Sequence, residues 1–204
     1  MYIPEAFKIN DRDRITDFME KQGFADLITY HNQSLCSNKV PLMLDKDKNV
    51  LYGHFGRSNP QLLDIEKSRD VLVIFSGPHS YISPRWYASE NMVPTWNFQT
   101  LQVKGTASLV DDNCLIEILE KLSTLHESNQ PNPWTMRELA PEKLDIMLKM
   151  IVGFKIDIHE INFKEKMSQN REIHDQQSLI DSLIKTNDTN SVNVASIMRK
   201  NIAG

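Results

Sequence analysis

Apolar and polar residues alternate along much of the first two thirds of the chain, with the period of two residues that predicts β-strands. The expected strands are 25–31, 40–45, 50–55, 71–75, 100–110 and 153–163. The polar stretch 45–49 predicts a hairpin loop, and Gly77-Pro78 is expected to end the fourth strand sharply. In the last strand the alternation slips near residue 160, which indicates a bulge.

Helical periodicity separates these strands at several points. Asp11 or Asp13 can cap a first helix, for which Gly23 would supply a left-handed stop. Further helices are expected at 60–66, from 111 or 112 to about 125, at 141–150, and as two weakly amphipathic pieces after 175. Because strands dominate the first two thirds, the pattern favours an antiparallel barrel with peripheral helices over a doubly wound sheet.

Composition narrows the choice of class. With 204 residues, 40% hydrophobic and 25% charged, the chain is long enough for one well-packed domain. A net charge of -4 provides no global basic field, which argues against direct DNA binding. Cys36 and Cys114 are isolated, which suits a reducing, cytoplasmic location, and no stretch approaches the length of a membrane span. The histidines are not spaced as metal ligands, so no metal site is expected.

A segment with phosphate-binding chemistry, 53–61, begins within the strand at 50–55. Arg57 offers a planar guanidinium fork, Ser58 and Asn59 add neutral donors, and His54 could add another. The glycines of this segment could let the backbone approach a ligand or adopt a positive φ. The same residues also fit a turn with a solvated arginine followed by a helix start.

Three later segments carry ring-binding or anion-binding groups: 77–87, with His79, Ser83 and Trp86; 93–98, with Trp96 and Asn97 just before a strand; and 166–171, with Lys166 and Arg171. An indole can cover a flat ring, and an amide can hydrogen-bond to its polar edge. The alternatives are core packing for the aromatic residues, turn capping for the asparagine and solvation for the cations.

In this order and spacing, and together with the opening Met1-Tyr2-Ile3-Pro4, the four segments resemble the PaiB-like family of FMN-binding negative transcriptional regulators. The resemblance runs to about Arg171. It implies a mainly β fold with peripheral helices, the antiparallel, Greek-key FMN-binding split β-barrel related to pyridoxamine phosphate oxidases. It also implies FMN as the cofactor and a homodimer with cofactor sites at the subunit interface.

The resemblance assigns cofactor binding to His54, Arg57, Ser58, Asn59, Ser83, Trp96 and Asn97. It makes His79, Trp86, Lys166 and Arg171 candidates for the pocket around the cofactor. We expect residues 1–171 to form the FMN-binding split-barrel domain and residues 172–204 a C-terminal helical extension. No residue is an evident proton donor or nucleophile, so no catalytic residue is named.

Three functions follow from these observations. The first is an FMN-binding regulator that acts indirectly on transcription. The second is an FMN-dependent oxidoreductase of pyridoxamine-oxidase type acting on a small substrate, although the arginine and histidine pair that holds the substrate phosphate in true pyridoxamine phosphate oxidases has no match here. The third is a non-catalytic protein-interaction module on the same fold, so whether the chain is an enzyme stays open.

Overall fold

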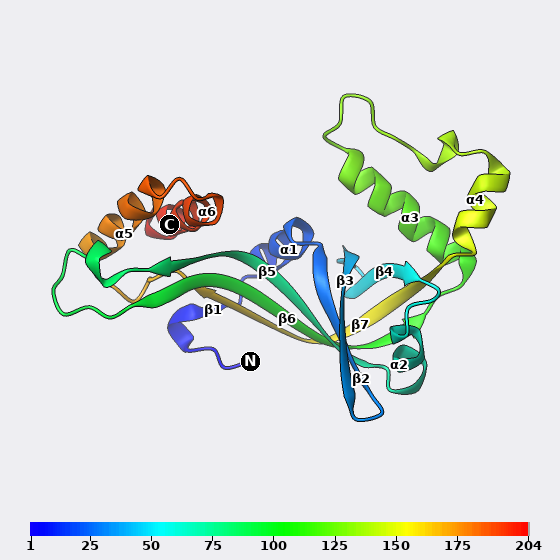
Figure 1. Cartoon of the computed structure of the whole chain (residues 1–204), viewed down its shortest axis with the longest axis horizontal. Helices are drawn as coiled ribbons and strands as arrows, with labels where there is room; N and C mark the ends of the chain where they lie inside the picture. Colours follow the sequence, from blue (N-terminus) through cyan, green and yellow to red (C-terminus); the bar gives the residue numbers. More distant parts are fainter. Residues whose placement is uncertain (204) are drawn as a thin grey trace. The chain divides into compact units, whose positions relative to one another are not determined.

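The computed structural model describes residues 1–203, which form seven strands, six α-helices and three short 3-10 helices. The strands are β1 (Lys8–Ile9), β2 (Phe24–His31), β3 (Ser34–Asp45), β4 (Val50–Gly56), β5 (Asp70–Ile82), β6 (Thr95–Leu109) and β7 (Ile151–Lys166) (Figure 1). The α-helices are α1 (Arg12–Lys21), α2 (Gln61–Lys67), α3 (Asp112–Glu127), α4 (Pro141–Leu148), α5 (Ile173–Lys185) and α6 (Thr189–Ala203). The 3-10 helices are η1 (Glu5–Phe7), η2 (Pro84–Trp86) and η3 (Met136–Glu138).

The strands form one sheet in the order β1-β7-β4-β3-β2-β5-β6, and β7 also pairs with β6. Because β6, the last strand in this order, pairs with β7, the six strands β7-β4-β3-β2-β5-β6 form a closed ring, which is the connectivity of a barrel. The pairs β1–β7, β2–β3, β2–β5, β3–β4 and β4–β7 are antiparallel. The predicted antiparallel barrel with peripheral helices is therefore confirmed.

The chain divides into two compact units. Unit 1 comprises Met1–Ile15, Ser76–Leu101 and Asn162–Gly204, and unit 2 comprises Thr16–Phe75 and Gln102–Ile161. Unit 2 contains four of the eleven predicted site residues and unit 1 contains the other seven, and the two groups are described separately below.

Unit 2 has an apolar core within its strands and a polar anchor for α2. The rings of Phe55 and Phe154 stack with centroids 5.1 Å apart. The buried Gln61 side chain donates from Nε2 to the carbonyl oxygens of Leu27, at 2.9 Å, and Cys36, at 3.2 Å. Because a buried amide is stabilising only when it is hydrogen-bonded, Gln61 fixes the start of α2 against the β2–β3 hairpin.

Two glycines of unit 2 act through close packing rather than through an unusual backbone. None of the glycines that the structure describes has a positive φ, so the predicted left-handed stop at Gly23 is wrong. The Gly23 carbonyl instead accepts from the Leu42 N–H at 2.7 Å, and a Cβ on Gly23 would lie 3.0 Å from the Leu42 carbonyl oxygen. Similarly, a Cβ on Gly53 would lie 2.8 Å from both Leu42 Cδ2 and Phe154 Cζ and 2.9 Å from the Pro41 carbonyl oxygen.

Replacing Gly53 by alanine is therefore expected to lower the free energy of unfolding by about 2 kcal/mol, because the added methyl group overpacks a site that includes backbone. Gly56→Ala is the matched control in the same strand, since a Cβ there meets no atom within 4 Å. We expect Gly56→Ala to stay within about 0.5 kcal/mol of the wild type in urea unfolding. Equal losses in the two variants would contradict the packing explanation.

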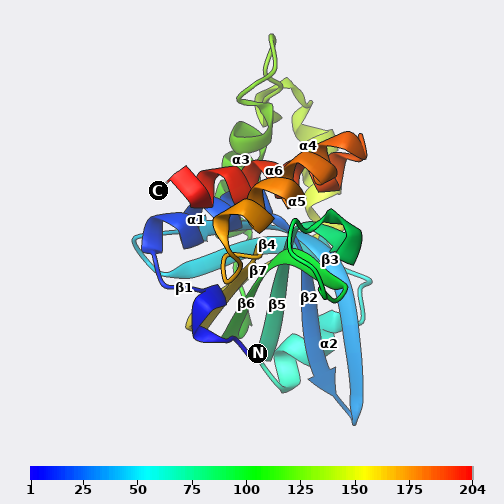
Figure 2. The same ribbon diagram turned by 90° about the vertical axis from the view of Figure 1, so that its left-hand side faces the viewer.

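In unit 1, helices α5 and α6 lie side by side (Figure 2) and bury one face of the strand segments. Ser80 of β5 hydrogen-bonds to Ser191 of α6 at 2.9 Å, and Asn97 of β6 donates to the Met198 sulfur of α6 at 3.5 Å. Glu165 of β7 accepts from Asn201 of α6 at 2.7 Å. Helix α6 therefore covers the same face of three neighbouring strands, here called the inner face. The apolar cluster beneath the two helices contains Ile82, Tyr87, Met167, Leu179, Ile180, Leu183, Val194, Ala195 and Met198.

Three strands, β5, β6 and β7, run from one unit into the other, and all three are longer than the sequence predicts. Strand β5 continues through Gly77-Pro78 to Ile82, so the expected stop is wrong, and β6 begins at Thr95 and contains Trp96 and Asn97. Proline is tolerated in a strand where its missing N–H is not needed for pairing. In β7 the buried positions change from Ile156, even-numbered, to Phe163, odd-numbered, in agreement with the slip near residue 160.

Candidate functional site

The segment 53–61, for which the sequence predicts phosphate binding, begins at the end of β4 in unit 2. His54 is half-buried, and its Nδ1 atom has no hydrogen-bond partner among residues 1–203. Burial lowers the pKa of His54, so the imidazole is neutral at pH 7. An unpaired buried nitrogen is costly to a fold, which makes it a candidate for pairing with a ligand.

Arg57 follows β4 directly and is exposed. Its Nε donates to the Lys149 carbonyl oxygen at 2.9 Å and its Nη2 to the Ile151 carbonyl oxygen at 3.0 Å. These two bonds hold the junction of α4 and β7 and orient the guanidinium group. A guanidinium has five N–H donors, so the remaining ones are available to a ligand.

The next two residues have different roles. Ser58 is exposed and free to face a ligand, whereas the Asn59 Oδ1 atom accepts from the Gln61 N–H at 3.0 Å. This contact supports the start of α2, as the turn alternative expected. It leaves the Asn59 amide nitrogen for a further hydrogen bond, so helix initiation and anion binding are compatible here.

The face of unit 1 opposite α6, here called the outer face, carries exposed aromatic side chains. Trp96 of β6 is 53% exposed and Tyr81 of β5 is 43% exposed. Their ring centroids are 5.9 Å apart in an edge-on arrangement, and the His79 ring lies 6.2 Å from that of Trp96. Large exposed aromatic rings grouped in this way form a platform for a flat ligand or a partner.

Other predicted residues of unit 1 are engaged inside the unit. The Asn97 side chain is fully buried, and its Oδ1 accepts from the Ser168 hydroxyl at 3.0 Å. The Ser83 hydroxyl accepts from the Arg85 N–H at 3.2 Å and caps η2. Trp86 is half-buried against the helical cluster, and its carbonyl oxygen accepts from the Ser178 hydroxyl at 2.7 Å.

Lys166 and Arg171 flank a tight turn at the end of β7. Ser168, within this turn, has a φ of 60°. The Arg171 N–H donates to the Ser168 carbonyl oxygen at 2.9 Å, and the Arg171 guanidinium lies 5.8 Å from the centre of the Tyr87 ring. Lys166 Nζ donates to the Trp96 carbonyl oxygen at 2.7 Å. Burial lowers the pKa of Lys166, and Lys164 and Arg171 lower it further.

Two buried carboxylates support this site and escaped sequence reasoning. Glu165 is 1% exposed and lies on the inner face, between two lysines that point outward. The alternation of β7 is the sequence signal that could have indicated its burial. Asp175 at the start of α5 accepts from the Ser89 N–H at 2.9 Å. Burial alone would raise the pKa of Asp175, but hydrogen bonds from Ser89, together with nearby His174, place it below the ordinary value. Asp175 thereby ties the loop after η2 to α5.

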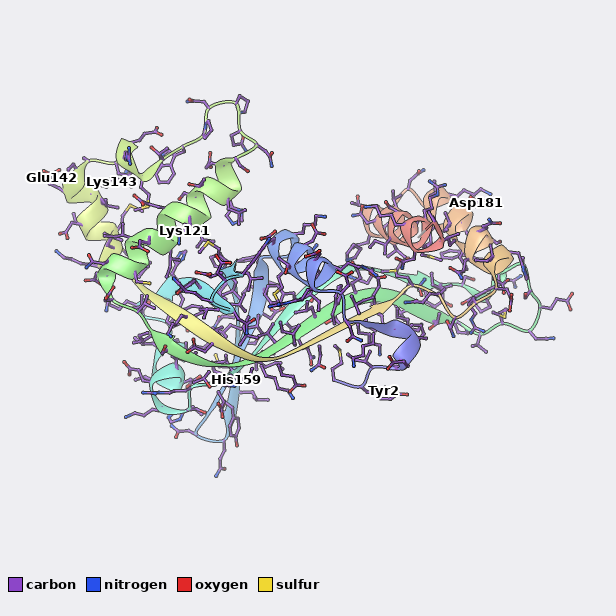
Figure 3. The ribbon with its side chains drawn as sticks, turned by 180° about the vertical axis from the view of Figure 1, so that it is seen from behind. Tyr2, Lys121, Glu142, Lys143, His159 and Asp181 are labelled. Carbon is purple, nitrogen blue, oxygen red and sulfur yellow. The ribbon has the colours of Figure 1, made fainter. Side chains whose placement is uncertain are left out.

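A separate cleft of about 520 Å³ lies in unit 2, beside α3, and none of the predicted site residues borders it. Lys121, labelled in Figure 3, and Glu120 supply charge from α3. The other bordering residues are Glu20, Leu42, Met43, Leu44, Thr124 and Leu125. Within residues 1–203, no three His, Cys, Asp or Glu side chains gather as a metal site. None of the helices in the same range has the length and apolar content needed to cross a membrane.

Each unit carries side chains whose chemistry can be compared with that of a flavin nucleotide. Unit 2 offers a guanidinium with free donors, an exposed hydroxyl and an unpaired imidazole nitrogen, which suit a phosphate monoester. Unit 1 offers an exposed aromatic platform, which suits the isoalloxazine ring.

Comparisons with known proteins identify the family of the chain. A relative, the protease synthase and sporulation protein PAI 2 of Bacillus subtilis, is 37% identical over 200 residues, covering 97% of this chain and 96% of the relative. The fold is similar to that of the flavocytochrome Anf3 from Azotobacter vinelandii, with a TM-score of 0.62, 13% identity and coverage of 78% and 69% of the two chains. It is also similar to that of the FAD and heme binding protein from Mycobacterium smegmatis, with a TM-score of 0.58, 12% identity and coverage of 78% and 73%. A family model described as "Putative FMN-binding domain" matches residues 1–160. The predicted family and cofactor are thus confirmed: this chain belongs to that family of FMN-binding domains, whose cofactor is FMN.

Proposed function

We propose that the chain binds the FMN phosphate through Arg57, Ser58, Asn59 and His54. The observation that carries this proposal is the oriented Arg57 guanidinium, which uses two N–H groups on backbone carbonyls and leaves the others free. The unpaired Nδ1 of His54 supports it, because a ligand could satisfy that buried atom.

For the ring end of FMN, we propose contacts with Trp96 and Ser83. We propose that Asn97 supports this part of the site from its buried position. Trp96 is exposed, whereas Asn97 is buried against Ser168, so their roles differ. His79, Trp86, Lys166 and Arg171 are proposed to border the pocket. When bound, FMN supplies the redox chemistry that side chains lack, and the protein supplies orientation and electrostatics.

We propose that the protein is a cytoplasmic homodimer that affects transcription indirectly. In this proposal residues 1–171 are the FMN-binding domain and residues 172–204 a helical extension. From 169 to 204 the four basic side chains, Arg171, Lys185, Arg199 and Lys200, balance the four acidic ones, Glu172, Asp175, Asp181 and Asp188. The apolar faces of α5 and α6 are used within unit 1. A helix that binds DNA is usually more basic and has a free face.

The second candidate is an FMN-dependent oxidoreductase. The observation that favours it is that unit 1 carries both exposed aromatic rings and the cations Lys166 and Arg171. Such a surface can receive a small molecule beside a flavin, which a purely structural cofactor would not require. We name no catalytic residue for this candidate.

The experiment that tests the proposed function is an absorption and fluorescence spectrum of the purified protein with and without added FMN, together with its mass in solution. We expect one FMN per subunit in a dimer. A protein of native mass that ignores FMN would contradict the proposed site. A parallel binding assay at physiological salt, with the chain's own promoter fragment, tests the indirect mechanism, and tight specific binding there would overturn it.

A further inference from the structure

Another cleft, of about 360 Å³, lies in unit 1 between the helices α5 and α6. Gln177, Ile180 and Asp181 border it from α5, and Arg199 and Ile202 border it from α6. None of these five residues belongs to the proposed cofactor site. The volume lies within the range typical of small-molecule sites in proteins.

The two helices bring opposite charges to this cleft, and these charges do not neutralise each other. Asp181 of α5 (Figure 3) and Arg199 of α6 are both exposed. Neither side chain forms an ion pair within residues 1–203. Asp181 does not pair with Lys185 either, although residues four apart on a helix are neighbours on its surface. The carboxylate and the guanidinium are therefore both available to a ligand.

The cleft also has an apolar side. Ile180 is 4% exposed, and Ile202 is partly buried against the apolar cluster of unit 1. Placing an aliphatic group against such a surface is favourable, because it removes apolar area from water. Gln177 adds an amide group, which can both donate and accept hydrogen bonds. The cleft thus combines an anion, a cation and an apolar surface within one small volume.

The helices that form the cleft are fixed by contacts elsewhere in unit 1. Leu179 and Leu183 of α5 and Met198 of α6 are each 0% exposed. Ser191 of α6 is also hydrogen-bonded to Ser80 of β5 at 2.9 Å. Because these contacts hold the backbone on both sides of the cleft, a ligand that bridges the helices has little ordering of backbone to oppose its binding.

From this arrangement we infer that the cleft between α5 and α6 binds a small zwitterion with an apolar side chain, of the aliphatic α-amino acid class. The ammonium group of the ligand donates to the Asp181 carboxylate, and the ligand carboxylate accepts from the Arg199 guanidinium. The aliphatic side chain lies against Ile180 and Ile202. The inference goes beyond the proposed function and does not rest on it, since it requires neither FMN nor any residue of the proposed cofactor site.

The test is a calorimetric titration of the full chain with L-leucine. Leucinamide, which lacks the carboxylate, and isocaproate, which lacks the ammonium group, are the matched probes. Both probes keep the aliphatic side chain, so a difference in affinity reports recognition of the missing charge. We expect L-leucine to bind more tightly than either probe.

Substitutions then assign the two charges to their partners. Asp181→Asn and Arg199→Gln should each weaken L-leucine binding about tenfold, because each removes one charge-assisted contact. Asp181→Asn should leave the weak binding of isocaproate unchanged, and Arg199→Gln should leave that of leucinamide unchanged. Lys200→Gln is the matched control, since Lys200 is an exposed cation next to Arg199 that does not border the cleft. It should change none of these affinities.

Three results would overturn the inference. The first is the absence of L-leucine binding to the wild type. The second is binding of leucinamide or isocaproate as tight as that of L-leucine, because the cleft would then recognise only one charge. The third is L-leucine binding that is unchanged in both Asp181→Asn and Arg199→Gln while circular dichroism shows the native fold, because the ligand would then lie elsewhere.

Discussion

Replacing Glu165 by alanine is expected to lower the free energy of unfolding by about 3 kcal/mol. The carboxylate is 1% exposed, and it accepts from Arg14 Nη2 at 2.8 Å, Asn201 Nδ2 at 2.7 Å and Gln99 Nε2 at 2.6 Å. Its removal leaves donors from α1, β6 and α6 without their shared acceptor. Arg14 is 44% exposed and can return to water, so the loss should fall at the lower end of the range for buried ion pairs.

Asp17→Ala provides the control for the Glu165 prediction. Asp17 also pairs with a cation, Lys21 at 2.7 Å, but both side chains are more than half exposed. An exposed pair four residues apart on a helix contributes about 0.5 kcal/mol or less. Denaturant unfolding of both variants should therefore separate them clearly, and a loss below about 1 kcal/mol for Glu165→Ala would refute the structural role assigned to this carboxylate.

Arg57→Ala is expected to weaken FMN binding by about 10- to 100-fold, since a hydrogen bond to a charged group contributes about 1.5–3 kcal/mol. Fluorescence titration with FMN measures this directly. Arg57→Lys keeps the charge but not the fork, and it should recover only part of the affinity.

The structure requires a second readout for Arg57. Because the guanidinium also binds the Lys149 and Ile151 carbonyl oxygens, Arg57→Ala should lose some stability at the junction of α4 and β7. Unfolding of each variant, alongside the exposed Arg137→Ala in the same unit, separates this loss from the loss of cofactor. If FMN affinity is unchanged while stability falls, Arg57 is a clamp for this junction and the phosphate assignment is wrong.

Local patterns were enough to predict most elements, because alternation and capping act over a few residues. The Asp111 side chain caps α3, as its position before an apolar periodic stretch indicated. Strand ends were less predictable. Gly77 and Pro78 indicate a break locally, but tertiary pairing carries β5 through them, and Gly23 is explained by its approach to Leu42 rather than by its own conformation.

For the site residues too, local patterns were informative and tertiary contacts were not predictable. Arg57 and Trp96 could be proposed from the sequence because a guanidinium after a strand and an indole in a polar segment carry their chemistry in their residue type. The alternation of β7 could place Glu165 on the inner face, but it could not identify its partner Arg14, which is 151 residues away. The buried state of Asn97 likewise depends on Ser168 and α6, which no local pattern contains.

The change of buried parity along β7 has a consequence for length variation in this protein. Lys164, Glu165 and Lys166 are neighbours in the sequence, yet the glutamate contacts α6 and the two lysines lie on the opposite surface. Deleting one residue between 157 and 162 would exchange these assignments, placing two ammonium groups under α6 and a carboxylate in water. Insertions and deletions in that stretch should therefore be tolerated in pairs and rejected singly.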